Sequence, residues 1–120
     1  MNVDSIRKYC LSFPQATENL QWGDDLCFKI GGKIFAVVSL ESAPQSLCFK
    51  CNPEKFAELC EHEGIAPAPY VGRYKWVLLD RLNVLPDPEL RDLIRESYEM
   101  VTSKTKVKAK VKAKPRRKKK

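Results

Sequence analysis

The side chains with the clearest chemical capacity are eleven cations in the last eighteen residues, 103–120, a segment that contains no acid. Lysine recurs at every second position from Lys104 to Lys114. Lysines on a flexible chain displace the counterions condensed on nucleic-acid phosphates, so they give affinity without base choice. The sequence therefore predicts phosphate binding by Lys104, Lys106, Lys108, Lys110, Lys112, Lys114, Arg116, Arg117, Lys118, Lys119 and Lys120.

The chain divides into two parts of opposite charge. Residues 1–102 hold eleven Lys and Arg against all fifteen Asp and Glu, a net charge of −4, although the whole chain carries +7. Between its charges, the segment 103–120 has only Val, Ala, Thr and Pro, which cannot bury enough apolar surface to offset the entropy cost of ordering. We expect a folded domain over 1–102 and a disordered lysine-rich tail over 103–120.

Two other roles for this tail are open. Lysines are attracted to anionic membranes or acidic proteins, although stable membrane attachment usually requires an apolar or lipid anchor, which the tail lacks. The tail is alternatively an extension that improves solubility and has no specific partner. Nucleic acid is the favoured partner, because basic arms most often serve to bind it.

A smaller group of basic and aromatic residues lies within the folded part. Lys29 and Lys33 flank an expected hairpin turn, and Arg73, Tyr74 and Lys75 form a basic loop that carries an aromatic ring. Cations in such a loop contact phosphate, while the ring stacks on an exposed base or sugar. We predict these five residues as further nucleic-acid contacts, with ordinary exposed turn residues as the alternative.

The cysteines give only a weak indication of a metal or redox site. Cys48 and Cys51 have the two-residue gap of a zinc or thiol redox motif, and Cys60 and His62 follow them. If Cys48 and Cys51 share a strand, however, their odd separation points them to opposite faces of the sheet. The favoured interpretation is buried structural cysteines, with no metal and no cofactor.

Neither catalysis nor tryptophan stacking is favoured by the remaining residues. A single histidine excludes sites that need two, and the chain has no nucleophile elbow, P-loop or dinucleotide-binding fingerprint. Trp22 and Trp76 are expected to be core or half-buried anchors rather than stacking platforms. We therefore expect a protein that is not an enzyme and has no catalytic residue.

The first elements that must position these residues are a helix and a hairpin. A helix is expected from Val3, because apolar residues recur at helical spacing until Pro14 ends the run. Two segments of strand-like composition, 26–30 and 33–40, are joined by the turn Gly31-Gly32 and predict a β-hairpin.

The second half of the folded part adds strands over 46–51 and 76–80, with a polar loop over 71–75. Helices are expected after Asn52-Pro53 and Asp87-Pro88, because both dipeptides place a capping side chain directly before a proline at the first helical position. The order of helix, several strands, helix, strand and helix predicts an α+β domain on a mostly antiparallel sheet.

Several short motifs, in their order along the chain, resemble the MmcQ/YjbR family. The resemblance covers almost all of 1–102 and is carried by Phe13-Pro14, Trp22, the hairpin 28–36, the run 47–50, Asn52-Pro53-Glu54, Pro67-Ala68-Pro69-Tyr70, Trp76, Leu79-Asp80, Ser97-Tyr98 and Val101. It implies a frataxin-like (CyaY-like) sandwich with helices packed on the sheet, and a DNA-binding role often described as a double wing. The family brings no catalytic residues, and the lysine tail is not part of its pattern.

Length, hydropathy and cysteine count predict the cellular context. About a hundred residues suffice for one domain with a single core. No run approaches the roughly 18 apolar residues of a membrane span, and the first residues do not read as a signal peptide. Five cysteines, an odd number, favour reduced thiols over a disulfide framework. We expect a soluble cytoplasmic protein with no membrane partner.

The function that these observations favour is non-enzymatic DNA binding, largely independent of sequence. The basic tail provides most of the affinity, with help from the basic loops. The alternative is a protein-interaction module, in which the acidic folded body docks a partner and the tail only solubilises or localises the protein.

Overall fold

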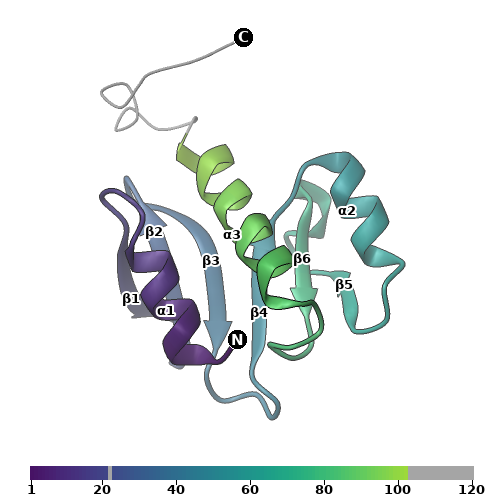
Figure 1. Cartoon of the computed structure of the whole chain (residues 1–120), viewed down its shortest axis with the longest axis horizontal. Coiled ribbons are helices and arrows are strands. Elements are labelled where there is room, and N and C mark those ends of the chain that lie inside the picture. The colour runs from purple at the N-terminus through teal and green to yellow at the C-terminus, as the bar shows by residue number, and fades with distance from the viewer. Residues whose placement is uncertain (22, 103–120) are drawn as a thin grey trace, which may run out of the picture.

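One antiparallel sheet, three α-helices and a short 3-10 helix make up residues 1–21 and 23–102, the part of the chain that this computed structural model describes (Figure 1). The strands are β1 (Thr17–Gln21), β2 (Asp25–Ile30), β3 (Lys33–Ser39), β4 (Ser46–Lys50), β5 (Ile65–Pro67) and β6 (Trp76–Leu79). Their order in the sheet is β1-β2-β3-β4-β6-β5. The helices are α1 (Val3–Leu11), α2 (Pro53–Cys60), α3 (Asp87–Thr102) and the 3-10 helix η1 (Gly72–Tyr74). The α+β class predicted from the sequence is confirmed.

The two N-terminal caps are local features of the sequence. At α1, the Asn2 side chain accepts a hydrogen bond from the Ser5 N–H at 2.8 Å, and the Ser5 hydroxyl accepts one from the Asn2 N–H at 2.9 Å. At α2, the Asn52 side chain accepts from the Lys55 N–H at 2.7 Å, with proline at the first helical position as predicted. Each cap satisfies backbone donors that the helix itself leaves unpaired.

The predicted hairpin of β2 and β3 is present. Its turn residues Gly31 and Gly32 have φ angles of 59° and 81°. A two-residue turn with both φ angles positive matches the right-handed twist of the strands and favours glycine. The turn therefore fixes the register and brings Lys29 and Lys33 to the same end of the sheet.

Three elements differ from the sequence-based expectations. β1 was not predicted, and it is an edge strand whose Leu20 is 57% exposed, so it lacks the alternating apolar pattern of a strand with one buried face. β5 is only three residues long and ends at Pro67, which is compatible with its place at the other edge. The expected polar loop over 71–75 contains η1.

The start of α3 also differs in detail. The helix includes Asp87, one residue earlier than a cap at this position requires. The Asp87 carboxylate accepts a hydrogen bond at 2.7 Å from the Met1 ammonium group. This ion pair joins the N-terminus to the helix that closes the domain.

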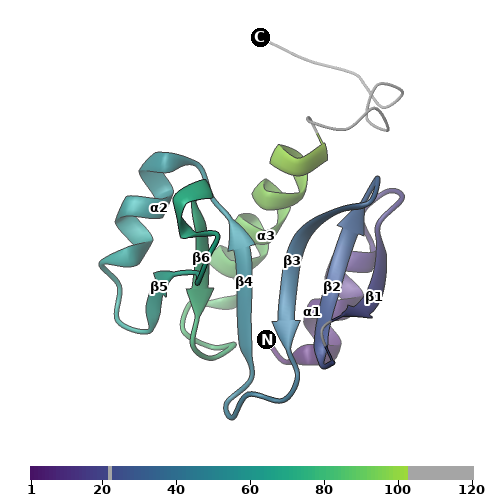
Figure 2. The same ribbon diagram turned by 180° about the vertical axis from the view of Figure 1, so that it is seen from behind.

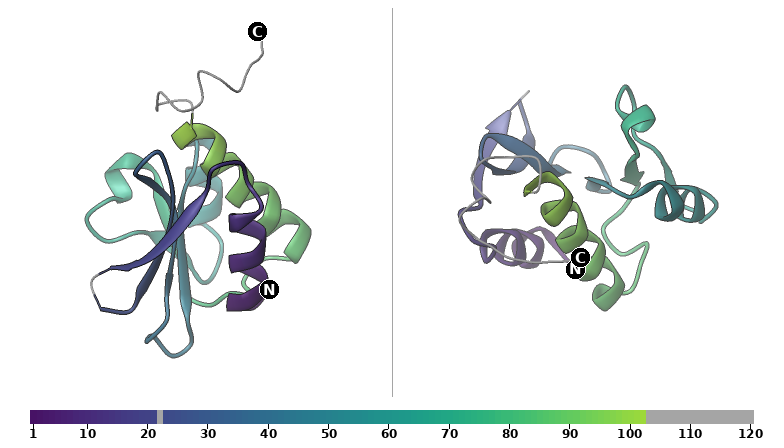
Figure 3. Two further views of the ribbon diagram at one scale, coloured as in Figure 1. Left: turned by 90° about the vertical axis from the view of Figure 1, so that its left-hand side faces the viewer. Right: turned by 90° about the horizontal axis from the view of Figure 1, so that it is seen from above.

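The helices α1 and α3 cover one face of the sheet (Figures 1 and 3). Their buried side chains pack on those that β2, β3, β4 and β6 direct toward the same side. The core includes Ile6, Phe28, Phe35, Phe49, Leu79, Leu90 and Ile94. Figure 2 shows the opposite face, which α1 and α3 leave uncovered and which we call the open face. Within the described residues, no helix is long and apolar enough to cross a membrane.

The sheet separates into two halves between β3 and β4. The two strands are paired from Ser39 and Ser46 up to Ala36 and Phe49, and the register ends there. Beyond this point, the fully buried Ser97 of α3 replaces the direct hydrogen bonds between the two strands. Its hydroxyl donates a hydrogen bond to the Phe35 carbonyl at 2.6 Å and accepts one from the Lys50 N–H at 3.0 Å.

Replacing this hydroxyl tests its role in stability. Ser97→Ala leaves the Phe35 carbonyl and the Lys50 N–H without this partner, which costs about 1–3 kcal/mol because both groups are withdrawn from water. We expect Tm to fall by roughly 4 to 20 °C, measured by circular dichroism or calorimetry. Ser12→Ala is the matched control, since the exposed Ser12 hydroxyl donates to the Tyr9 carbonyl where water can replace it. An equal and small effect of both substitutions would contradict this account.

Candidate nucleic-acid interface

Four parts of the domain lie at one end and carry the predicted basic residues. They are the turn between β2 and β3, the end of β4, η1 and the last turn of α3, all in the upper part of Figure 1. Because α3 ends at Thr102, the segment 103–120 continues from this end. We call it the basic end, and its cations are Lys29, Lys33, Lys50, Arg73 and Lys75.

Close backbone packing positions the basic loop. A Cβ atom on Gly72 would lie 2.9 Å from the Pro67 Cβ, so only glycine allows η1 to approach β5 this closely. The Tyr74 carbonyl accepts a hydrogen bond from the Lys50 Nζ at 3.0 Å, which joins the loop to the end of β4. The Arg73 guanidinium carbon lies 4.9 Å from the centre of the Tyr74 ring, a cation–π distance.

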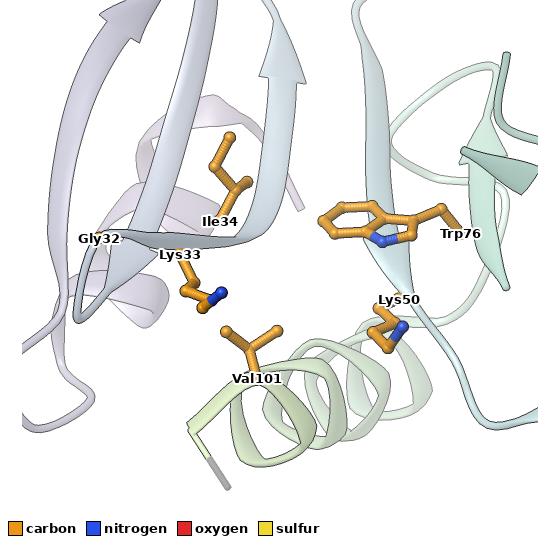
Figure 4. Close-up of a pocket in the computed structure, with 6 residues that line it drawn as sticks. All are labelled: Gly32, Lys33, Ile34, Lys50, Trp76 and Val101. Atoms are coloured by element: carbon orange, nitrogen blue, oxygen red, sulfur yellow. The ribbon is translucent and has the colours of Figure 1, made fainter. Parts of the chain in front are cut away.

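A cavity of about 450 Å³ opens where β3 and β4 separate. Its lining residues come from the hairpin turn, β3, β4, β6 and α3: Gly32, Lys33, Ile34, Lys50, Trp76 and Val101. Figure 4 shows the Lys33 side chain and the Trp76 indole projecting into the gap between the two strands, above α3. The cavity thus combines two ammonium groups with an aromatic and aliphatic wall.

Most cations at this end are not neutralised by carboxylates. Among the described residues, Lys29, Lys33, Arg73 and Lys75 form no ion pair with an acid. By contrast, three arginines elsewhere are paired: Arg7 with Glu18, Arg81 with Asp80, and Arg95 with Asp92. An unpaired cation keeps its charge available to an anionic ligand, whereas the carboxylates of Glu96 and Glu99 on the last turns of α3 lie beside Asn52.

Carboxylates gather at the opposite end of β2 and β3. Asp25 is paired in register with Ser39 there, and Asp24 and Glu41 lie in the adjoining turns. A hydrogen bond and charge repulsion from Asp24 raise the pKa of the Glu41 carboxyl, which shows that two acids are crowded together. Strands of this length separate the two ends by about 20 Å, well beyond the roughly 8 Å screening length at physiological salt.

A second cavity, of about 470 Å³, lies on the open face. It is bounded by the loop before η1 and by the outer side chains of the central strands, and it is lined by Asp25, Ile34, Val37, Cys48, Ala68, Pro69, Tyr70, Val71 and Trp76. Burial raises the pKa of the Cys48 thiol to about 11, so this thiol is uncharged at neutral pH. Ile34 and Trp76 line both cavities.

The two cysteines of the C-x-x-C motif lie on different sides of the sheet, as predicted. Cys48 lines the cavity on the open face, whereas Cys51 is buried in the core beneath α3. Burial raises the pKa of the Cys51 thiol to about 12. All five cysteines of the chain are free thiols. No group of three or more His, Cys, Asp or Glu side chains in the described ranges is placed to hold a metal ion.

The structure places the five basic and aromatic residues predicted within the domain at the same end of the sheet, on the two sides of the gap between β3 and β4. Lys33 lines the first cavity, and Lys29 lies opposite Ile34 in the β2–β3 register. Arg73 and Tyr74 are exposed on η1, and Lys75 follows with its ammonium group 5.2 Å from the Phe56 ring centre. Whether these residues contact nucleic acid stays a prediction.

Sequence reasoning did not identify Lys50 or Tyr70 as site residues. Lys50 lies near the end of the predicted strand 46–51, and Tyr70 belongs to the motif Pro67-Ala68-Pro69-Tyr70. Both residues thus belong to segments that the sequence analysis described, but it assigned them no role in a site. Trp76 is half-buried, as expected of an anchor, and also forms part of both cavity walls.

The remaining predicted contacts lie outside the described residues, and so does Trp22, which was expected to be an anchor. The basic residues concerned are Lys104, Lys106, Lys108, Lys110, Lys112, Lys114, Arg116, Arg117, Lys118, Lys119 and Lys120.

Comparison with known proteins identifies the class to which this fold and site belong. A family model described as YjbR matches residues 11–100. The chain therefore belongs to the YjbR family, also called MmcQ/YjbR, and the resemblance seen in the sequence is confirmed. No curated protein matches the chain.

Two solved structures are similar to this chain. One is the crystal structure of Deinococcus radiodurans protein DR2400, which carries a domain named DUF419. It is 30% identical, with a TM-score of 0.81 over 91% of this chain and 86% of that protein. The other is a protein from Pseudomonas syringae, 20% identical, with a TM-score of 0.70 over 84% of this chain and 99% of that one. The second likeness concerns the fold alone.

The raised pKa of Cys48 predicts slow alkylation. With a pKa of about 11, only about 0.1% of this thiol is ionised at pH 8, so iodoacetamide should modify it roughly 200-fold more slowly than a peptide cysteine. The rate should rise about tenfold per pH unit up to pH 10, as mass spectrometry of Cys48 peptides can measure. Unfolding in urea is the control, because all five cysteines should then react alike. Rapid modification of native Cys48 at pH 8 would contradict the raised pKa of this thiol.

Proposed function

We propose that this chain is a non-enzymatic DNA-binding protein with largely sequence-independent affinity. The eleven cations of 103–120 provide most of that affinity, and the basic end of the domain adds to it. The observation that carries the proposal is the position of Lys29, Lys33, Arg73 and Lys75. These four unpaired cations gather at the end of the domain from which the eleven continue.

The polarity of the domain supports this arrangement despite the net charge of −4 over residues 1–102. A phosphate chain at the basic end meets unpaired ammonium and guanidinium groups at short range. The carboxylates Asp24 and Glu41 lie in turns at the opposite end of the strands, where salt screens most of their repulsion. Local potential rather than net charge therefore decides where DNA binds.

The proposal includes a finer description of the fold and the location. We infer a frataxin-like (CyaY-like) sandwich, which is supported by α1 and α3 packed on one face of an antiparallel sheet (Figure 3). We further infer a cytoplasmic protein, which is supported by five cysteines that are all free thiols. The proposal assigns no catalytic residue and no cofactor.

Removal of the tail tests the main source of affinity. A chain that ends at Thr102 should keep its fold and lose at least about 100-fold in affinity for a 20-base-pair duplex at 50 mM salt, because its −4 charge offers few phosphate contacts. Circular dichroism checks the fold, and fluorescence anisotropy measures the affinity. Undiminished binding would show that the folded surface carries recognition. A full-length chain that binds no DNA at low salt would favour the protein-interaction alternative.

Charge reversal tests the basic end with the tail in place. Lys33→Glu combined with Arg73→Glu should weaken duplex binding about tenfold or more and should lower the slope of log affinity against log salt by about 2, since each lost phosphate contact removes roughly 0.9. Lys8→Glu combined with Arg91→Glu is the matched control. It changes the net charge equally, at exposed positions on α1 and α3. Equal losses in both double variants would mean that only net charge matters and that the basic end is not a contact surface.

A further inference from the structure

We propose that the two adjoining cavities receive an unpaired base of a single-stranded polynucleotide, so that the folded domain itself distinguishes single strands from duplex. This inference rests on the proposed nucleic-acid binding and adds to it the strand form that the site prefers. DNA and RNA single strands share the chemistry required, namely a flat base on a phosphodiester chain.

The two adjoining cavities place cations beside an apolar wall. The first holds Lys33 and Lys50 at its rim, and the second lies farther along the open face. Since Ile34 and Trp76 line both, the two hollows adjoin at these side chains. A phosphate bound at the rim therefore places its attached base next to the apolar wall.

The second cavity matches the uncharged face of a base. Val37 and the neutral thiol of Cys48 come from adjacent strands, where they are paired in register. Among the residues that line this cavity, Asp25 alone carries a charge, and it lies at the end of β2 opposite to the basic end. The carboxylate of Asp25 thus repels phosphate from the second cavity, and the ammonium groups of Lys33 and Lys50 attract it to the first. This orients a nucleotide with its base in the second cavity.

Exposed rings beside the cavity are the second independent observation. Of four large apolar side chains exposed in the described residues, Tyr70, Val71 and Tyr74 lie in this loop region, and only Leu20 lies elsewhere. Tyr70 is 96% exposed and has a φ angle of 68°, a left-handed conformation that few residues other than glycine adopt. A strained backbone that holds an aromatic ring in water is typical of a binding site.

The combination of exposed aromatic rings and unpaired cations favours single strands over duplex. In a duplex, each base face is already stacked on its neighbours and is inaccessible to a protein ring. In a single strand, successive bases stack on aromatic side chains while cations follow the phosphates, with little dependence on base identity. Tyr70, Tyr74 and Trp76 provide rings within one short segment, interleaved with Arg73 and Lys75.

The test compares single-stranded and duplex probes on the full chain. Fluorescence anisotropy measures Kd for labelled oligo(dT) of 20 nucleotides, oligo(U) of the same length and a 20-base-pair duplex. Tyr70→Ala should weaken binding of the single strands about 5- to 30-fold and leave duplex affinity and the salt slope unchanged. Because Tyr70 is almost fully exposed, its removal should not alter the fold.

Two controls separate stacking from other causes. Leu20→Ala removes the other exposed apolar side chain, on the edge strand β1, and should change neither affinity. An oligonucleotide of abasic sites retains the phosphates but loses every base contact, so it should bind the unaltered protein at least as weakly as oligo(dT) binds the Tyr70→Ala variant. In a Trp22→Phe background, oligo(dT) should quench the fluorescence of Trp76.

Each outcome bears on one proposal. If Tyr70→Ala lowers duplex and single-strand affinity equally, or lowers neither, the inference of base stacking is wrong while DNA binding stands. If the full chain binds none of the probes at low salt, the proposed function itself fails. A stronger response with oligo(U) or with oligo(dT) identifies which kind of single strand the site prefers.

Discussion

The hydroxyl of Ser97 links the two halves of the sheet where their own hydrogen bonds stop. Strands that part within a core would leave a carbonyl and an N–H unpaired, at a cost of about 1–3 kcal/mol. Because Ser97 donates to Phe35 and accepts from Lys50, the gap between β3 and β4 is compatible with a folded core. The cavity at the basic end depends on that gap. A single side chain of α3 therefore permits both the split sheet and the site.

The arrangement of charge matters more than its sum. A net charge of −4 for residues 1–102 suggests a body that repels phosphate. The structure instead separates positive from negative side chains along the strands, with Lys29 and Lys33 at one end of the hairpin and Asp25 at the other. Strand pairing creates this polarity, because each turn residue is carried to one fixed end of the sheet. An acidic net charge of the domain is thus compatible with a group of cations at one of its ends.

The sequence predicted elements defined by local signals and missed those defined by tertiary pairing. The hairpin has a Gly-Gly turn, and α2 has an Asn-Pro cap, so both were readable. β1 and β5 are short edge strands whose structure depends on pairing with β2 and β6, and they leave little apolar pattern in the sequence. Within the site, Lys33 and Arg73 were found as exposed turn residues. The contribution of Lys50 depends on the separation of β3 and β4, which no local pattern indicates.

The last turn of α3 lies between the first cavity and the start of the eleven-cation segment in the chain. Val101 lines the first cavity, and the next residue is the last before the eleven-cation segment. In the proposed binding mode, contact with phosphates by that segment makes any contact in the cavity an intramolecular step. Short flexible connections give effective concentrations of about a millimolar, so contacts too weak to form alone become populated. In that proposed mode, avidity would let a shallow site choose among nucleic-acid forms, while the affinity would come mainly from charge.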